Sequence, residues 1–326
     1  MTDEPLTNLL VLNTPVHRQC DVLIDGKPRT VRLRIRASTP GLDAGPIVIG
    51  DRIDLSPIDD ADEADLLRVH TRHNHLVRRR PGEREEPMVM CANVDRLLCI
   101  VSSAQPKPAW GMLDRSLVIA EAQRIPPTVV LTKSDLKGAA AAREHARMYE
   151  QVGYPVLSVS IISGEGVEAL REHTRDAITM MLGQSGVGKS ALTAALSSES
   201  REVGKISHRT GKGRHTTTRA RLVPLHGGGF LADPPGIRAL VAWDIEDDRL
   251  AYLFPDLRKH LDDCKFGGSC THIHEPGCAI LAALERGDID PRRHQAYTRM
   301  LLKADRTSSP MPRPMDPDDP TFDPYQ

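Results

Sequence analysis

Residues 183–190 read Gly-Gln-Ser-Gly-Val-Gly-Lys-Ser and match the pattern G-x-x-x-x-G-K-[ST] at every fixed position. An apolar run from Ile178 to Leu182 precedes them, and Ser190 to Leu196 continues with helical spacing. In a strand–loop–helix of this kind, backbone N–H groups surround a diphosphate and the helix N-terminus adds its positive dipole end. We expect Lys189 to contact the β- and γ-phosphates and Ser190 to bind Mg²⁺. The predicted phosphate loop consists of Gly183, Gln184, Ser185, Gly186, Val187, Gly188, Lys189 and Ser190.

Composition limits the class of protein further. A chain of 326 residues, 40% of them hydrophobic, is long enough for two or three domains with ordinary cores. The formal net charge is only −1, so any contact with nucleic acid must come from local patches. The N-terminus lacks the basic and apolar regions of a secretion signal, and no apolar run approaches the roughly 18 residues of a spanning helix. We expect a cytoplasmic protein without a membrane segment.

The N-terminal segment has the pattern of a small β domain. Short alternating runs at Cys20–Ile24, Thr30–Ile35 and Ile47–Leu55 are separated by turn residues. Arg29, Arg32, Arg34 and Arg36 lie in or beside the second run, three of them on one face, which is either a solvated face or one that contacts phosphates. Residues 68–84 hold six arginines and three histidines with a single acid, which favours contact with nucleic acid.

The next region alternates strands with helices. Arg96–Ser102 and Thr128–Leu131 read as buried strands, with a helix predicted over Leu113–Gln123, and this order predicts a parallel α/β sheet. The second strand runs into Thr132, Lys133, Ser134 and Asp135, which is close to the N-K-x-D motif that reads guanine.

The chemistry of that motif rests on Asp135. A carboxylate accepts hydrogen bonds from both N1–H and the exocyclic amine of guanine, a pair of donors that adenine does not offer in the same arrangement. Thr132 replaces the asparagine whose amide normally braces the site. Ser160, after a further predicted strand at Pro155–Ser160, begins a loop similar to the one that packs beneath a guanine ring.

Switch-like motifs follow the phosphate loop. The basic stretch Lys212–Arg219 contains Thr216, Thr217 and Thr218, any of which could bind Mg²⁺, and we assign Thr217. His215 is a candidate to position water, with a phosphate or RNA contact as the alternative. Asp233-Pro234-Pro235-Gly236 fits D-x-x-G, in which Asp233 holds Mg²⁺ through water and Gly236 contacts the γ-phosphate. Because Ile237 follows where many GTPases have glutamine, we expect slow intrinsic turnover. The base-reading motif precedes the phosphate loop, so the motifs are circularly permuted.

A cluster of cysteines near the C-terminus predicts a metal site. Its spacing is Cys264-x₅-Cys270-x-His272-x₅-Cys278, which supplies three thiolates and one imidazole for a tetrahedral zinc ion. His274 is a competing ligand, and reduced structural cysteines are the alternative. Helices are predicted over Asp247–Asp262, Ala279–Arg286 and Pro291–Leu302.

The ordered set of motifs, from about residue 45 to residue 303, resembles the ribosome small subunit-dependent GTPase A family of circularly permuted GTPases. The resemblance rests on Ala92–Arg96, Leu113–Arg115, Gly213–Thr218 and the motifs above. It implies an N-terminal OB-fold-like β domain over 1–85, a permuted phosphate-loop GTPase domain with a doubly wound, mostly parallel sheet over 86–243, and a helical zinc domain over 244–305. Residues 306–326, rich in proline and acids, read as a disordered tail.

The resemblance also implies a function. Such a chain would bind GTP and GDP with Mg²⁺ and one structural Zn²⁺, act as a monomer on the small ribosomal subunit and its rRNA, and hydrolyse GTP to time a late maturation step. Turnover would be slow alone and stimulated by the subunit. The alternatives are an ATP-using phosphate-loop enzyme, an RNA-binding assembly scaffold with weak nucleotide turnover, and a related permuted GTPase of the large subunit.

Overall fold

A computed structural model describes residues 4–43, 45–79, 87–198, 220–233 and 247–304. The chain divides into two compact units. The first contains residues 1–97, 167–181 and 189–239, and the second contains residues 98–166, 182–188 and 240–326. In the described segments no helix combines the length and the apolar character that crossing a membrane requires.

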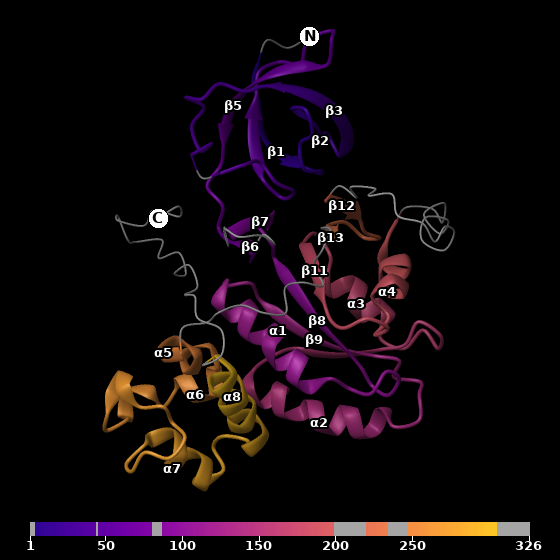
Figure 1. The fold of residues 1–326 in the computed structure, drawn as a ribbon. Helices are drawn as coiled ribbons and strands as arrows, with labels where there is room; N and C mark the ends of the chain where they lie inside the picture. The colour runs from indigo at the N-terminus through magenta and orange to yellow at the C-terminus, as the bar shows by residue number, and fades with distance from the viewer. Residues whose placement is uncertain (1–3, 44, 80–86, 199–219, 234–246, 305–326) are drawn as a thin grey trace, which may run out of the picture. The chain divides into compact units, whose positions relative to one another are not determined.

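The first unit begins with a closed five-stranded barrel (Figure 1). Its strands follow the order β1-β2-β3-β5-β4, and β4 closes onto β1. The expected small β domain is therefore confirmed, although β1 lies ahead of the region where strands were predicted and the residues at 47–51 are not part of a strand. The barrel strands are β1 (Leu6–Val11), β2 (Gln19–Ile24), β3 (Lys27–Arg34), β4 (Arg52–Leu55) and β5 (Glu63–Val69).

The arginines of β3 lie on the outer face of this barrel. Val31 and Leu33 point into the core, so the alternating Arg32 and Arg34 are exposed. Arg34 pairs with Asp59 at 2.8 Å and Asp65 at 3.1 Å, and other acids of the same stretch pair with Arg29 (Asp62, 2.9 Å) and Arg32 (Glu63, 3.7 Å). Acids of the same barrel thus offset the charge that made this face a candidate for phosphate contact.

The basic stretch that follows does not form a single exposed surface. Arg72 is buried and donates to both carboxylate oxygens of Asp51, at 2.7 and 2.8 Å, and to the Pro46 carbonyl at 2.8 Å. His70 pairs with Asp54 at 2.7 Å. These two side chains stabilise the first unit, while residues 80–86 of the stretch lie outside the described segments. The stretch also contributes β6 (His75–Arg79), which pairs antiparallel with β7 (Pro87–Ala92).

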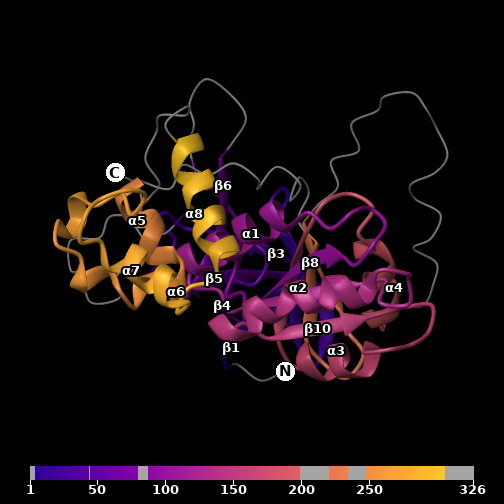
Figure 2. The ribbon, with the colours of Figure 1, turned by 90° about the horizontal axis from the view of Figure 1, so that it is seen from below.

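An α/β sheet carries the motifs. Its strand order is β10-β9-β8-β11-β13-β12, with β9 parallel to β10, β11 parallel to β13, and β12 antiparallel to β13. In the second unit, helices α1 and α2 pack against β9, and α2 also packs against β10 (Figures 1 and 2). The sheet strands are β8 (Arg96–Ser102), β9 (Pro127–Thr132), β10 (Val156–Val159), β11 (Ile178–Leu182), β12 (Arg221–Pro224) and β13 (Phe230–Asp233), and the helices are α1 (Trp110–Ala122), α2 (Ala139–Val152), α3 (Val167–His173) and α4 (Lys189–Leu196).

The C-terminal helices belong to the second unit. The long helix predicted over Asp247–Asp262 is wrong: the chain forms short pieces there, and Pro255 starts a new helix because it lacks the N–H that would continue the preceding turn. The other two predicted helices are present. The elements are α5 (Asp247–Leu250), η3 (Ala251–Leu253), α6 (Pro255–Arg258), η4 (Leu261–Asp263), η5 (Gly267–Ser269), α7 (Ala279–Arg286) and α8 (Pro291–Ala304).

A buried arginine joins these C-terminal helices to α1. Arg293 of α8 is 1% exposed and bonds to Asp114 of α1 at 2.8 Å and to Asp256 of α6 at 3.2 Å. Burial opposes the charge, but the two carboxylates raise the pKa of Arg293 above its ordinary value. Its guanidinium also lies 4.6 Å from the centre of the Phe254 ring. The second unit is therefore held together by a desolvated ion-pair network in addition to apolar packing.

Candidate nucleotide-binding site and metal centre

The base loop, Thr132–Asp135, leaves the end of β9. The β-branched and apolar residues of β9 are buried, as is usual in a parallel strand covered on both faces, and the polar residues of the loop begin where this strand ends. Thr132 is still buried at 4% exposure, whereas Asp135 is exposed. Lys133 adopts a left-handed backbone conformation, with φ of 58°, and the chain turns there. The loop thus presents its acid to solvent at the carboxyl edge of the sheet, where ligands of open α/β sheets bind.

Two hydrogen bonds tie the base loop to the phosphate loop. The Thr132 hydroxyl donates to the Val187 carbonyl at 2.6 Å, and the Lys133 ammonium donates to the Gly186 carbonyl at 2.9 Å. Lys133 also donates to the carbonyl of Gln105, in the segment after β8. All of these contacts lie within the second unit. Thr132 lacks the amide of the asparagine that usually stands at this position of the motif. The structure shows that its hydroxyl makes a bracing contact instead.

The phosphate loop needs its glycines for two reasons. A Cβ on Gly183 would lie 2.5 Å from the Ile100 carbonyl oxygen, so only glycine fits against β8 at that point. Gly186 and Gly188 have φ of +81° and +105°, which side-chain-bearing residues rarely adopt. Val187 between them is buried and anchors the loop, while Ser185 is exposed. Helix α4 begins at Lys189, directly after Gly188, and Ser190 is exposed in its first turn.

A second loop fixes the position of Asp135. The Ser160 hydroxyl donates to Asp135 Oδ1 at 2.5 Å and accepts from the backbone N–H groups of Ile162 and Ser163 at 3.2 and 3.1 Å. Ser160 itself is 1% exposed. Because the hydroxyl proton is directed at the carboxylate, one oxygen of Asp135 is oriented before any ligand arrives.

Sequence reasoning missed the group that holds these two loops together. The Ser134 hydroxyl donates to Glu165 Oε2 at 2.6 Å, and Arg143 of α2 donates to Glu165 Oε1 at 3.0 Å. Gly166, next to Glu165, packs its backbone directly against the Ser158 carbonyl. Only glycine fits there, since a Cβ would lie 2.0 Å from the Ser158 carbonyl oxygen. The only sequence signal was the Gly-Glu-Gly tripeptide at 164–166, whose glycines mark a tight turn.

Of the predicted switch residues, only Asp233 lies in the described segments. Asp233 is the last residue of β13 and is exposed. Thr217, His215 and Gly236 lie outside the described segments. Their roles stay predictions.

The candidate metal centre consists of Cys264, Cys270, His272 and Cys278, all buried, and their ligand atoms lie within 4.8 Å of one another. His272 Nδ1 lies 3.5 Å from the sulfur of Cys264 and 3.5 Å from that of Cys278, and these two sulfurs are 3.9 Å apart. A tetrahedral ion with Zn–S of about 2.3 Å and Zn–N of about 2.0 Å requires N···S near 3.5 Å and S···S near 3.8 Å. Three of the donors therefore have the spacing that zinc requires, and the sulfur of Cys270 lies within 4.8 Å of them. His274 is exposed and not part of the cluster.

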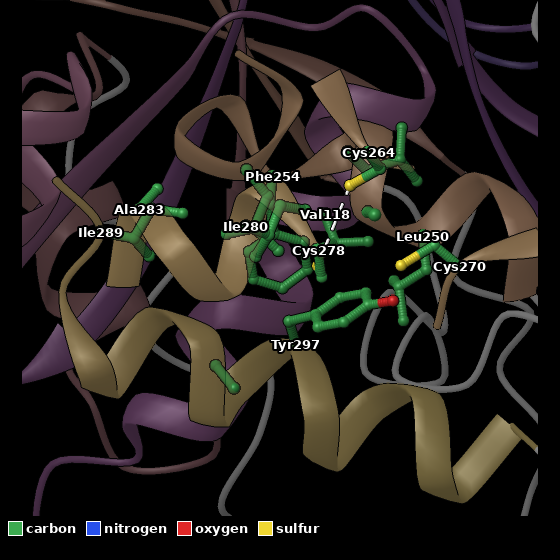
Figure 3. Packing of buried hydrophobic residues seen from close by; sticks show 14 of the residues in the cluster. Val118, Leu250, Phe254, Cys264, Cys270, Cys278, Ile280, Ala283, Ile289 and Tyr297 are labelled. Carbon is green, nitrogen blue, oxygen red and sulfur yellow. Dashed lines mark hydrogen bonds between the residues drawn. The ribbon is translucent and has the colours of Figure 1, made fainter. Parts of the chain in front are cut away.

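The metal centre also belongs to a packed core. Figure 3 shows the three cysteine sulfurs among apolar side chains that include Phe254, Ile280 and Tyr297. The Tyr297 hydroxyl donates to the Thr271 carbonyl at 2.9 Å. Val118 of α1 belongs to the same cluster, so the ligands and the first helix of the sheet region share one core.

The fold and the site define a phosphate-loop α/β protein in which the base loop precedes the phosphate loop. Residues 69–243 match the family model described as RsgA GTPase. The chain belongs to this family of GTPases.

Relatives and solved structures agree with this assignment. The chain is 39% identical over 258 residues to the small ribosomal subunit biogenesis GTPase RsgA of Gemmatimonas aurantiaca, covering 78% of this chain and 83% of that protein. The protein of the same name from Shewanella oneidensis is 38% identical over 279 residues, 84% of this chain and 78% of the relative. Among solved structures, YjeQ from Thermotoga maritima superposes with a TM-score of 0.74 at 27% identity, over 93% of this chain and 100% of that one. YloQ, a circularly permuted GTPase, gives 0.72 at 27% identity over 93% and 97%.

Proposed function

We propose that this chain binds the small ribosomal subunit and hydrolyses GTP to GDP and phosphate at a late step of the subunit's maturation. The relatives named above carry biogenesis of that subunit in their names. The observation that supports a nucleotide-dependent role most directly is the pair of hydrogen bonds from Thr132 and Lys133 to the phosphate loop. They link the segment that carries Asp135, the proposed base-reading acid, to residues 183–188, the proposed phosphate-binding backbone.

Guanine reading would rest on Asp135. Its carboxylate, oriented by Ser160, accepts from N1–H and the exocyclic amine of guanine. The backbone N–H groups of Gly183, Gln184, Ser185, Gly186, Val187 and Gly188 surround the phosphates, and Lys189 neutralises the β- and γ-phosphates. The base and phosphate ends of one nucleotide would thus contact loops that are bonded to each other.

Hydrolysis needs a water molecule in line with the γ-phosphate. The water oxygen bonds to the γ-phosphorus as the bond to the β–γ bridging oxygen breaks, and the products are GDP and inorganic phosphate, with the water's proton released. Hydroxyl and carboxylate oxygens of Ser190, Thr217 and Asp233 suit Mg²⁺, which would offset the charge that develops on the phosphate oxygens. We assign contact with the γ-phosphate to Gly236 and water positioning to His215.

The remaining features of the proposal follow from the resemblance and from this site. The chain would act as a monomer in the cytoplasm and contact rRNA, with domains over residues 1–85, 86–243 and 244–305 and a tail over 306–326. The zinc ion would be structural, because the four ligands leave no open position for a substrate.

Turnover with and without small ribosomal subunits tests the proposal. The isolated protein should hydrolyse GTP at a rate of the order of 10⁻⁴ s⁻¹, and added subunits should raise the rate by orders of magnitude. Lys189→Ala should abolish the stimulated rate. If Lys189→Ala still sediments with subunits but no longer supports their maturation, the RNA-binding scaffold is excluded. Fast turnover by the isolated protein with no stimulation by subunits would overturn the proposal.

A further inference from the structure

The segment that carries the imidazole ligand has a strained backbone. His272 adopts φ of 58°, in the left-handed region that side-chain-bearing residues rarely occupy. The left-handed turn directs the imidazole toward the sulfurs of Cys264 and Cys278. A free loop would leave this conformation, so other groups must hold it.

Glu275 supplies hydrogen bonds on each side of the ligand. Its Oε1 accepts from the backbone N–H of Thr271 at 2.8 Å and from the Thr271 hydroxyl. Its Oε2 accepts from the backbone N–H groups of Ile273 and His274 at 3.1 and 3.2 Å. The residues immediately before and after His272 are therefore bonded to one carboxylate, and hydrogen bonds to a charged acceptor are about twice as strong as neutral ones.

The backbone of Glu275 contacts another ligand. Its carbonyl accepts from the Cys278 N–H at 3.2 Å. One residue thus links the positions of the imidazole and of a thiolate. The cluster of four ligand atoms does not include the Glu275 carboxylate, whose two oxygens each accept the bonds given above.

Helix α8 holds the same segment independently. The His294 ring donates from Nε2 to the His272 carbonyl at 2.8 Å, and the Tyr297 hydroxyl donates to the Thr271 carbonyl. These contacts remain when Glu275 is changed. The segment should therefore stay attached to the C-terminal core in a Glu275 variant, while the angle of the imidazole becomes free to vary.

We propose that Glu275 is a positioning residue of the metal centre: its carboxylate holds the 271–274 backbone so that His272 Nδ1 occupies the fourth vertex of a Cys₃His site. Removing it should weaken metal binding without removing a ligand. Outer residues of this kind typically contribute 10- to 100-fold in metal affinity, and we expect a loss of about that size in Glu275→Ala. Glu275→Gln, which keeps one acceptor oxygen and turns the other side into a donor, should show a smaller loss in the same direction.

The test uses the full chain and two metals. Zn²⁺ affinity is measured by competition with a chromogenic chelator for the wild type, Glu275→Ala, Glu275→Gln and the control Glu285→Ala, whose side chain is exposed on α7. Co²⁺ substituted for zinc reports the ligand set, since its visible d–d bands respond to loss of an imidazole while thiolate charge-transfer bands persist. His272→Ala gives the spectrum of a site without that imidazole.

The expected result is a 10- to 100-fold loss of Zn²⁺ affinity in Glu275→Ala, a Co²⁺ spectrum shifted toward that of His272→Ala, and no change in Glu285→Ala. Glu275→Ala should lower the melting temperature of the zinc-bound protein by more than that of the metal-free protein, because the zinc-bound form also loses metal affinity. The proposal is overturned if affinity and spectrum are unchanged, or if Glu275→Ala lowers the melting temperature equally with and without zinc, which would indicate a general structural role. Should Glu275→Ala fail to fold, Glu275→Gln decides by the same readouts.

Discussion

Valine at position 132 would remove the hydroxyl that bonds the base loop to the phosphate loop while keeping the shape of the side chain. Thr132 is 4% exposed and Val187 is 1% exposed, so the carbonyl that accepts the 2.6 Å bond has little access to water. A buried carbonyl left without its donor costs about 1–3 kcal/mol. The β-branched replacement suits the strand end equally well, so the change is confined to the hydrogen bond.

That cost should appear as weaker nucleotide binding. In the free variant the two loops relax away from each other, and a nucleotide must restore their positions when it binds. A cost of 1–3 kcal/mol corresponds to an affinity about 5- to 150-fold lower. The affinities for GTP and for GDP should fall by the same factor, because the hydrogen bond is remote from the γ-phosphate. Thr132→Ser keeps the hydroxyl and should bind close to the wild type.

Calorimetric titration with GDP and a non-hydrolysable GTP analogue measures both affinities, and urea unfolding of the nucleotide-free proteins measures stability. Unchanged affinities together with a lower unfolding free energy in Thr132→Val would show that the bond only stabilises the fold. That outcome refutes the reasoning, as would a loss of affinity for the triphosphate alone.

Two further predictions concern the buried ion-pair network of Arg293 and the cysteines. Arg293→Met should lower the unfolding free energy by about 3–5 kcal/mol, because Asp114 and Asp256 would be left buried without their cation. The control Arg299→Met, on the exposed side of α8, should be nearly neutral. Urea unfolding measures the stability of both variants. Chelation of zinc should expose the three clustered thiols to a thiol reagent at pH 8. The other cysteines, Cys20, Cys91 and Cys99, should stay unreactive in the folded chain because burial raises the pKa of each thiol. The pKa of Cys20 is raised to about 12. Reaction of all six thiols, or of none, would contradict this second prediction.

Local patterns predicted the parts of the molecule that depend on local chemistry. Glycine placement and apolar periodicity, which are patterns within a few residues, predicted the loop at 183–188 with its flanking strand and helix, and also helix α7. The clustering of Cys264, Cys270, His272 and Cys278 could be predicted for the same reason, since their spacing is typical of a tetrahedral zinc site.

Contacts between distant segments were not predictable in this way. Arg72 sits in a basic stretch that suggested nucleic acid, yet it is buried because Asp51, far away in the sequence, provides a bidentate partner. Glu165 carries no motif and acts through Ser134 and Arg143, which only the fold brings near it. The fold decides which acid pairs with which basic side chain. A charge pattern in the sequence therefore overstates how many basic side chains face solvent.

The most direct test of a single guanine-nucleotide site is the base preference of Asp135→Asn. A carboxamide offers an N–H where the carboxylate only accepts, and xanthine carries a carbonyl where guanine carries its amine. Affinities for GTP, ATP and XTP are measured by titration for the wild type and the variant. The wild type should prefer GTP, and the variant should lose GTP binding, a difference of a few kcal/mol, and gain XTP binding. Equal binding of ATP and GTP by the wild type, or an unchanged preference for GTP in the variant, would contradict the account.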